Sequence, residues 1–162
     1  MSGQFRGVQA IIREEFPNAI YVHCSAHSLN LAICHSCTVQ PVRNCIGTVS
    51  NVVNFFHYPK RNQELKAKVL EQLNSSSTLL SLCETRWVEK HNAAVERFVD
   101  LYKPLVSALE ELEMDSNKET SSKASQLLNT VTKCAFLVSL CVLQSLFSLT
   151  SNLSSLSNNC KQ

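Results

Sequence analysis

The sequence predicts a mainly helical protein, and three features of the sequence support this. Of its 162 residues only 3 are glycine and 4 are proline, too few for the frequent turns of a many-stranded sandwich or barrel. Its hydrophobic fraction of 44% and charged fraction of 17% are typical of a folded domain. Most of its apolar residues recur at helical spacing, and a single short segment has the composition of a strand.

The first part of the chain predicts helix, strand and helix. Residues 5–16 carry apolar side chains at helical spacing, and Pro17 ends this helix. Residues 19–22 are apolar and β-prone, which predicts a buried strand. Ser25 can cap a second helix that runs to about Cys37. One strand cannot make a sheet, so its partners must come from elsewhere, and we expect the isolated chain to be poorly soluble.

The rest of the chain predicts helices alone. Helices are expected over residues 42–56 and 61–73, broken at Tyr58-Pro59, with a polar break at 74–77. Residues 87–112 predict one long amphipathic helix, in which Pro104 marks a kink or a junction of two helices.

The C-terminal part predicts a linker, a helix and a fraying tail. Residues 115–122 are polar and predict a linker, and a last long helix is expected from residue 124 to about 151. Beyond it, the tail is rich in Ser and Asn. The apolar run 134–149 is shorter than the roughly 20 residues that span a bilayer and contains Gln144, so we expect a buried core helix there.

Cysteine content and charge limit the location and the partners. The chain has 8 Cys but no secretory signal at its start, which predicts reduced thiols in a nuclear or cytoplasmic, not secreted, protein. Its net charge of +2 neither requires nor excludes nucleic acid. The densest basic segment is residues 60–68, and its interspersed Glu64 favours an ordinary solvated helix face.

The carboxylates do not suggest an enzyme. Two-metal phosphoryl transfer needs clustered carboxylates, whereas the two Asp residues, Asp100 and Asp115, lie in a helix and a linker. A Cys–His hydrolase centred on Cys24 is a weak alternative, because no oxyanion motif or third member is identifiable.

Four residues have the spacing of a zinc site, Cys24, His27, Cys34 and Cys37. The residues between the two pairs read as a continuous helix, which would separate the pairs by about 15 Å. The alternative is that Cys34 and Cys37 are small buried hydrophobic residues.

Arg86 and Trp87 are a candidate for nucleic-acid contact, because arginine can bind a phosphate while tryptophan stacks on a base. The alternative is that Trp87 belongs to the core at the start of a helix.

Three motifs, in this order, resemble hAT-type transposases. Residues 1–3 (Met-Ser-Gly) resemble the end of the block that carries the second catalytic aspartate of that family. Residues 24–31 match its Cys-x-x-His signature at Cys24 and His27. Residues 85–87 (Thr-Arg-Trp) match the Arg-Trp block at which the helical insertion of the family begins. The resemblance spans essentially the whole chain and is closest to host genes derived from such transposases.

The resemblance implies an RNase H-like α/β core interrupted by an all-helical insertion. Residues 1–40 would then be a partial core, and residues 41–162 would belong to the insertion. Active members bind two divalent ions through three acidic residues, and the second of these would precede Met1. The resemblance therefore implies a fragment that is not an enzyme by itself and has no cofactor in this chain.

The resemblance also implies roles for the motif residues. Cys24 and His27 would lie near the active site of the family, and Arg86 and Trp87 become DNA-contact candidates. The expected partners are DNA and other protein chains, with no membrane and no small-molecule substrate. A small zinc-stabilised helical module for protein interaction, built on the four zinc-spaced residues, is the alternative.

Overall fold

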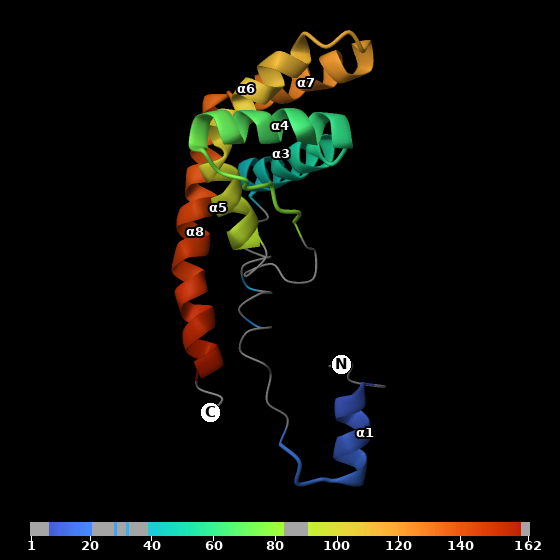
Figure 1. The fold of residues 1–162 in the computed structure, drawn as a ribbon. Coiled ribbons are helices and arrows are strands. Elements are labelled where there is room, and N and C mark those ends of the chain that lie inside the picture. Colours follow the sequence, from blue (N-terminus) through green and yellow to red (C-terminus); the bar gives the residue numbers. More distant parts are fainter. Residues whose placement is uncertain (1–6, 21–27, 29–31, 33–38, 83–90, 160–162) are drawn as a thin grey trace.

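The computed structural model describes residues 7–20, 28, 32, 39–82 and 91–159, with side chains of the last range up to residue 149. Within these ranges the protein is all-helical, with seven helices and no strand (Figure 1). In chain order these are α1 (Val8–Glu15), α3 (Gln40–Phe56), α4 (Pro59–Leu73), α5 (Asn92–Asp100), α6 (Tyr102–Glu113), α7 (Lys118–Val131) and α8 (Cys134–Asn159).

Six of these helices form a bundle around one hydrophobic core. Helix α6 packs against α4 and α7, while α3 packs against α4, α7 and α8, and α5 packs against α8. The C-terminal part of α8 extends past α5, and α1 lies apart from the bundle (Figure 1). None of the residues of α1 is buried.

Large apolar side chains from α5, α6 and α8 fill the centre of the bundle. Those with almost no exposed surface include Phe98, Leu101, Leu105, Leu109, Leu143 and Phe147. Burial of each such side chain stabilises the fold by about 1.5–3 kcal/mol relative to exposure. Packing of these faces, rather than the helix propensity of each segment, therefore holds the helices together.

The junction between α3 and α4 follows the sequence prediction. Pro59 occupies the first turn of α4, where its missing N–H has no intrahelical partner to lose. Asn74 ends α4 in the left-handed conformation at φ 48°, and its N–H donates to the carbonyl of Leu70. Asparagine tolerates this conformation better than most residues, which explains the polar break after Leu73.

The buried strand predicted over residues 19–22 is not seen. Ala19 and Ile20 adopt no regular structure, and Ile20 is 88% exposed, while residues 21 and 22 lie outside the described part. A strand needs a neighbour to satisfy its backbone groups, and the described residues supply no strand to pair with it. The RNase H-like strand of the predicted fold is thus absent from the described residues. The helix predicted from Ser25 to about Cys37 lies outside them except for Ser28 and Ala32, whereas helices are present in the other regions where they were predicted.

The long helix predicted to end at Leu112 is divided at Leu101. Helix α5 ends at Asp100 and α6 begins at Tyr102, so the junction of two helices, rather than a kink, accounts for Pro104. Proline disrupts the interior of a helix but fits its first turn, where Pro104 lies and where it is buried.

The polar linker predicted over residues 115–122 is mostly helix. Helix α7 begins at Lys118 because Asn117 caps it, its side-chain oxygen accepting from the N–H groups of Glu119 at 3.0 Å and Thr120 at 3.1 Å. The first turn of α7 is polar, and a capped helix can be hydrophilic there, so its composition resembles that of a loop.

The last helix also differs from the prediction. It is interrupted at Thr132-Lys133, where α7 and α8 meet at a bend of 67°. The hydroxyl of Thr132 donates to the carbonyl of Leu128 at 2.8 Å, a bond that competes with regular helix geometry. Helix α8 then continues to Asn159, so the tail expected to fray from Ser151 is helical over most of its length.

Candidate interaction surfaces

The residues singled out by sequence motifs lie outside the described part of the chain. These are Cys24, His27, Cys34, Cys37, Arg86 and Trp87. Their roles as active-site neighbours, zinc ligands or DNA contacts therefore remain predictions. Between the two zinc-spaced pairs, Ser28 and Ala32 are described, and both are helical.

The described carboxylates form no metal site. No group of three or more His, Cys, Asp or Glu side chains among the described residues could hold an ion. Asp100 is exposed at the end of α5, whereas Asp115 lies in the loop before α7 and pairs with Lys60. The two Asp residues of the chain, which were the candidates for acidic catalysis, thus lie on separate surfaces.

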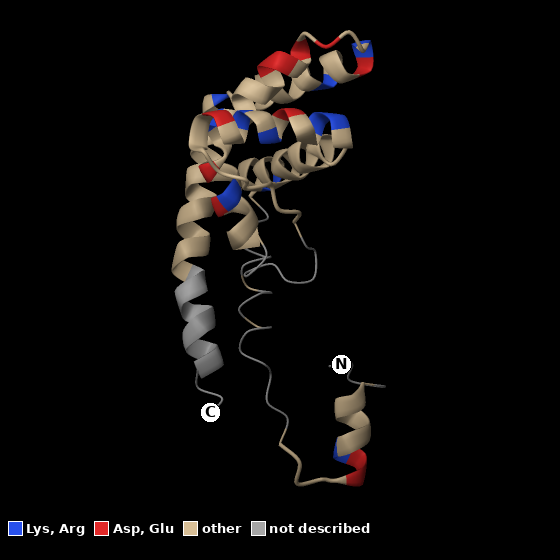
Figure 2. Ribbon diagram, in the orientation of Figure 1, with Lys and Arg blue, Asp and Glu red and all other residues tan. Residues whose placement is uncertain are grey.

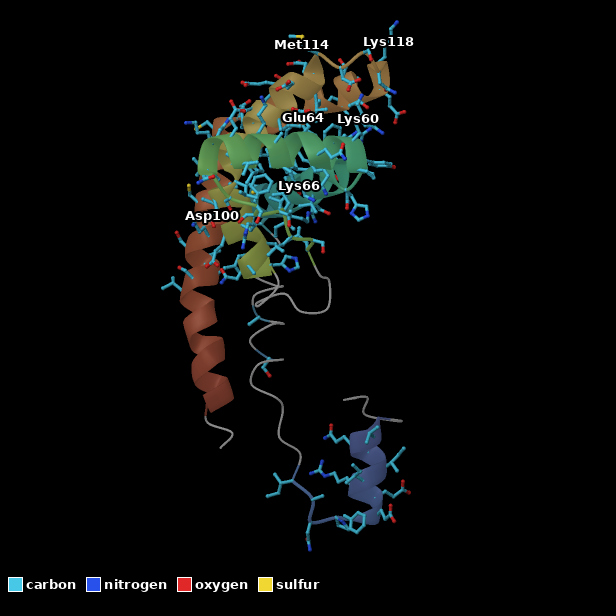
Figure 3. The ribbon with its side chains drawn as sticks, viewed as in Figure 1. Lys60, Glu64, Lys66, Asp100, Met114 and Lys118 are labelled. Atoms are coloured by element: carbon cyan, nitrogen blue, oxygen red, sulfur yellow. The ribbon has the colours of Figure 1, made fainter. Side chains whose placement is uncertain are left out.

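Two of the four basic residues in the segment 60–68 of α4 pair with neighbouring carboxylates. Lys60 lies 2.8 Å from Asp115, and Lys68 lies 2.6 Å from Glu111 on α6. Lys66, labelled in Figure 3, is an exposed residue of α4 and has no ion-pair partner among the described carboxylates. This arrangement agrees with the interpretation of a solvated helix face, because Lys60 and Lys68 pair with carboxylates of the same chain.

Hydrogen bonding in these pairs changes the acidity of their members. The ammonium of Lys60, followed by the backbone N–H of Asn117, lowers the pKa of Asp115. The carboxylate of Glu111 raises the pKa of Lys68. Both shifts favour the charged forms and couple α4 to α6 and to the loop before α7.

Arg61 lies in a different environment from the neighbouring lysines. Its guanidinium carbon lies 4.4 Å from the centre of the Phe55 ring and 4.7 Å from that of Tyr58. It donates to the Phe55 carbonyl at 3.5 Å and to the Thr120 hydroxyl at 3.2 Å. The only signal of this site in the sequence is the position of two aromatic residues three and six places before an arginine.

Helix α8 presents two different faces. One packs into the bundle through Phe136, Leu140, Leu143 and Phe147, which are at most 6% exposed. The other exposes an apolar stripe, defined here as Val138, Val142, Leu146 and Leu149. These four residues are between 40% and 67% exposed, and the whole of α8 carries no charged residue. Figure 2 shows the contrast with the mixed charges of α4, α6 and α7. The core helix predicted over residues 134–149 is therefore buried on one side only.

The described cysteines fall into two classes. Cys45 is buried between α3 and α8, its thiol 3.9 Å from the carbonyl of Phe136, and burial raises its pKa to about 12. Cys134 and Cys141 are exposed on α8, and all three are free thiols. Cys45 is therefore a packing residue, because a thiol that stays protonated at neutral pH is a poor nucleophile.

No single helix among the described residues is long and apolar enough to cross a membrane. Helix α7 and residues 134–149 of α8 reach the required length and composition only when taken together, across their bend of 67°.

Comparison with known proteins identifies distant relatives. Two proteins named "52 kDa repressor of the inhibitor of the protein kinase", from Homo sapiens and Mus musculus, are each 29% identical to this chain. The alignments cover 92% of this chain but 21% of each relative, so the chain spans about a fifth of their length. No protein-family profile and no solved structure matches the chain. The chain is therefore distantly related to these repressors over most of its length.

Proposed function

We propose that the chain is a non-catalytic helical segment of a hAT transposase-derived protein and that it works by contact with other proteins. Two findings support the ancestry. The distant relationship covers 92% of the chain. In addition, helices occupy the region in which that resemblance places an insertion, from Gln40 onward.

One observation supports protein contact above DNA contact. The lysines of α4 that could bind phosphates are mostly paired with carboxylates, whereas the apolar stripe of α8 is exposed and uncharged. DNA binding depends on concentrated cationic charge, while protein interfaces are built around apolar cores. The relatives carry a name that describes action on another protein, an inhibitor of a kinase, which is consistent with this mode of action.

Substitution of the stripe tests this function. Val142→Asp places a charge on the stripe, and Leu70→Asp makes the same kind of change at a 60% exposed residue of α4. We expect proximity labelling in cells to lose a defined set of neighbouring proteins with Val142→Asp and to retain that set with Leu70→Asp. Equal loss or equal retention in both variants would contradict the proposal.

A binding measurement with DNA separates the two modes. We expect fluorescence anisotropy with a labelled duplex to show only weak binding that disappears between about 50 and 200 mM salt, as for non-specific contact with phosphates. Tight binding that persists at the higher salt concentration would favour a DNA-binding function instead, carried by residues such as Arg86 and Trp87.

A further inference from the structure

A cavity of about 320 Å³ lies where the end of α3, the start of α4 and the middle of α7 meet. Its lining includes the aromatic ring of Tyr58, the guanidinium of Arg61 and the ammonium of Lys123. Three carboxamides complete its polar lining, those of Asn51, Asn54 and Gln126. Arg61 belongs to the basic segment 60–68, whereas the residues that resemble hAT motifs are not among those that line the cavity.

The carboxamides of the cavity are available for a ligand. The side chains of Asn51, Asn54 and Gln126 are exposed and make no hydrogen bond to any group in the described part of the chain. A carboxamide has both donor and acceptor groups, so each can pair with the N–H and C=O of an extended peptide backbone. Three of them around one cavity provide several such pairings.

Arg61 is held in a fixed orientation but retains hydrogen-bonding capacity. Stacking on Phe55 and Tyr58 fixes the plane of its guanidinium, and two hydrogen bonds anchor it. An arginine has five N–H donors, so two bonds leave three for a ligand. No described carboxylate lies within ion-pair distance of Arg61.

The charges around the cavity favour a ligand with one negative charge. Lys123 already pairs with Glu119 at 2.6 Å, so Arg61 is the one lining cation without an ion-pair partner in the described residues. Glu119 is 72% exposed and would repel a chain of phosphates. A single carboxylate matches the planar fork of Arg61 and needs no further cation.

We propose that this cavity binds a carboxylate-bearing segment of an extended peptide. The carboxylate, from a Glu or Asp side chain, accepts hydrogen bonds from Arg61, and the carboxamides pair with the backbone of the peptide. The exposed ring of Tyr58 packs against its side chains. This inference rests on the proposed function of protein contact and assigns a peptide chemistry to a surface separate from the stripe of α8.

An NMR titration of the whole ¹⁵N-labelled chain tests the proposal. The probe is the peptide acetyl-Ala-Glu-Ala-amide, and its matched control is acetyl-Ala-Gln-Ala-amide. We expect the Glu peptide to shift the side-chain signals of Arg61, Asn54 and Gln126 at millimolar concentration and the Gln peptide to bind about tenfold more weakly, because a charge-assisted hydrogen bond is lost.

Three variants assign the effect to the cavity. Arg61→Lys keeps the charge but removes the planar fork, and we expect about tenfold weaker binding of the Glu peptide. Gln126→Ala changes an exposed residue that the fold does not need, and about fivefold weaker binding is expected for one lost neutral hydrogen bond. Lys66→Gln, which removes a cation outside the cavity, should leave binding unchanged.

Several outcomes would overturn the proposal. These are no shift at about 10 mM peptide, equal binding of the two peptides, equal effects of Gln126→Ala and Lys66→Gln, or stronger binding of adenosine monophosphate than of the Glu peptide. The last result would indicate a nucleotide site. None of these results changes the dependence of protein neighbours on Val142, so failure of this inference is distinguishable from failure of the proposed function.

Discussion

Helices α4, α6 and α7 expose residues of a different kind from those that helix α8 exposes. On α4, α6 and α7 many exposed residues are charged, and Lys60, Lys68 and Lys123 bind carboxylates of the same surface. On α8 the residues facing away from the bundle are mostly apolar, and no charge interrupts them. The first surface is adapted to water, whereas the second has the composition of a surface that another protein covers.

This difference indicates which surface of the described residues can bind a partner. A surface whose charges already pair with each other has little binding capacity left, apart from the cavity at Arg61. An exposed apolar stripe lowers the solubility of the protein. It contributes to stability only when another surface covers it.

The largest effect is expected at the contact between α5 and α8. Phe98 is completely buried, and its ring centre lies 6.0 Å from that of Phe136. Phe98→Ala should lower the free energy of unfolding by about 3–5 kcal/mol, measured by urea denaturation. Leu149→Ala, on the exposed side of α8, should change it by less than about 0.5 kcal/mol. Similar losses in both variants would show that the two faces of α8 are not distinct.

A smaller effect is expected at the cap of α7. Asn117 accepts two hydrogen bonds from backbone N–H groups that have no other partner. Asn117→Ala should therefore destabilise the protein by about 1 kcal/mol in thermal or urea unfolding. Ser122→Ala, an exposed change one turn further along α7, is the control and should have no measurable effect. An unchanged stability of Asn117→Ala would mean that the cap does not set the start of α7.

The pairing of charges on α4 and α7 predicts a modest dependence of stability on pH. Folding lowers the pKa of Asp115 through Lys60 and that of Glu119 through Lys123, so the unfolded chain binds more protons in mild acid. Their contribution is complete above the ordinary pKa values of 3.8 and 4.5 and is lost as the pH falls through the lowered values.

A double substitution tests this dependence. Lys60→Gln with Lys123→Gln should flatten the acid limb of stability between about pH 5 and pH 2, measured by urea denaturation at each pH. The effect should be small because Lys60, Glu119 and Lys123 are exposed to solvent. An acid limb of unchanged steepness would show that other carboxylates cause it.

The smallest effect is expected from removal of zinc. The sequence predicts a continuous helix between the pairs Cys24/His27 and Cys34/Cys37, which would hold the pairs too far apart for one ion. Treatment with a chelator should therefore leave the melting temperature unchanged. Stoichiometric zinc in the purified chain, with a lower melting temperature after chelation, would support the alternative of a zinc-stabilised module.

The sequence predicted the helices well wherever their boundaries depend on local chemistry. Pro59 and Asn74 marked the limits of α4, because proline and asparagine act through their own backbone preferences. The sequence failed where tertiary contact decides. The pattern of residues 124–151 does not indicate the bend at Thr132. This bend allows α8 to place Phe136 and Leu140 against the bundle.

The candidate surfaces were harder to predict than the helices. Residues 134–149 were recognised as apolar, but which of them face outward depends on where α3 and α5 pack, and this cannot be read from one helix. The cavity at Arg61 joins residues of α3 and α4 to residues of α7, about sixty positions away in the chain. The motifs that resemble hAT transposases could be recognised because each is contiguous in the sequence. Almost all of their residues lie outside the described part of the chain.

The thiols of α8 give the most direct test of whether its outer face is a contact surface. Cys141 is exposed beside Val142, whereas Cys45 is buried and has a pKa of about 12. Alkylation with iodoacetamide should modify Cys141 readily in the purified chain and much more slowly in intact cells, with Val142→Asp restoring the faster rate there. Cys45 should stay unmodified throughout, which confirms that the chain is folded. Equal alkylation of Cys141 in the purified chain and in cells would show that nothing covers this face and would contradict the account.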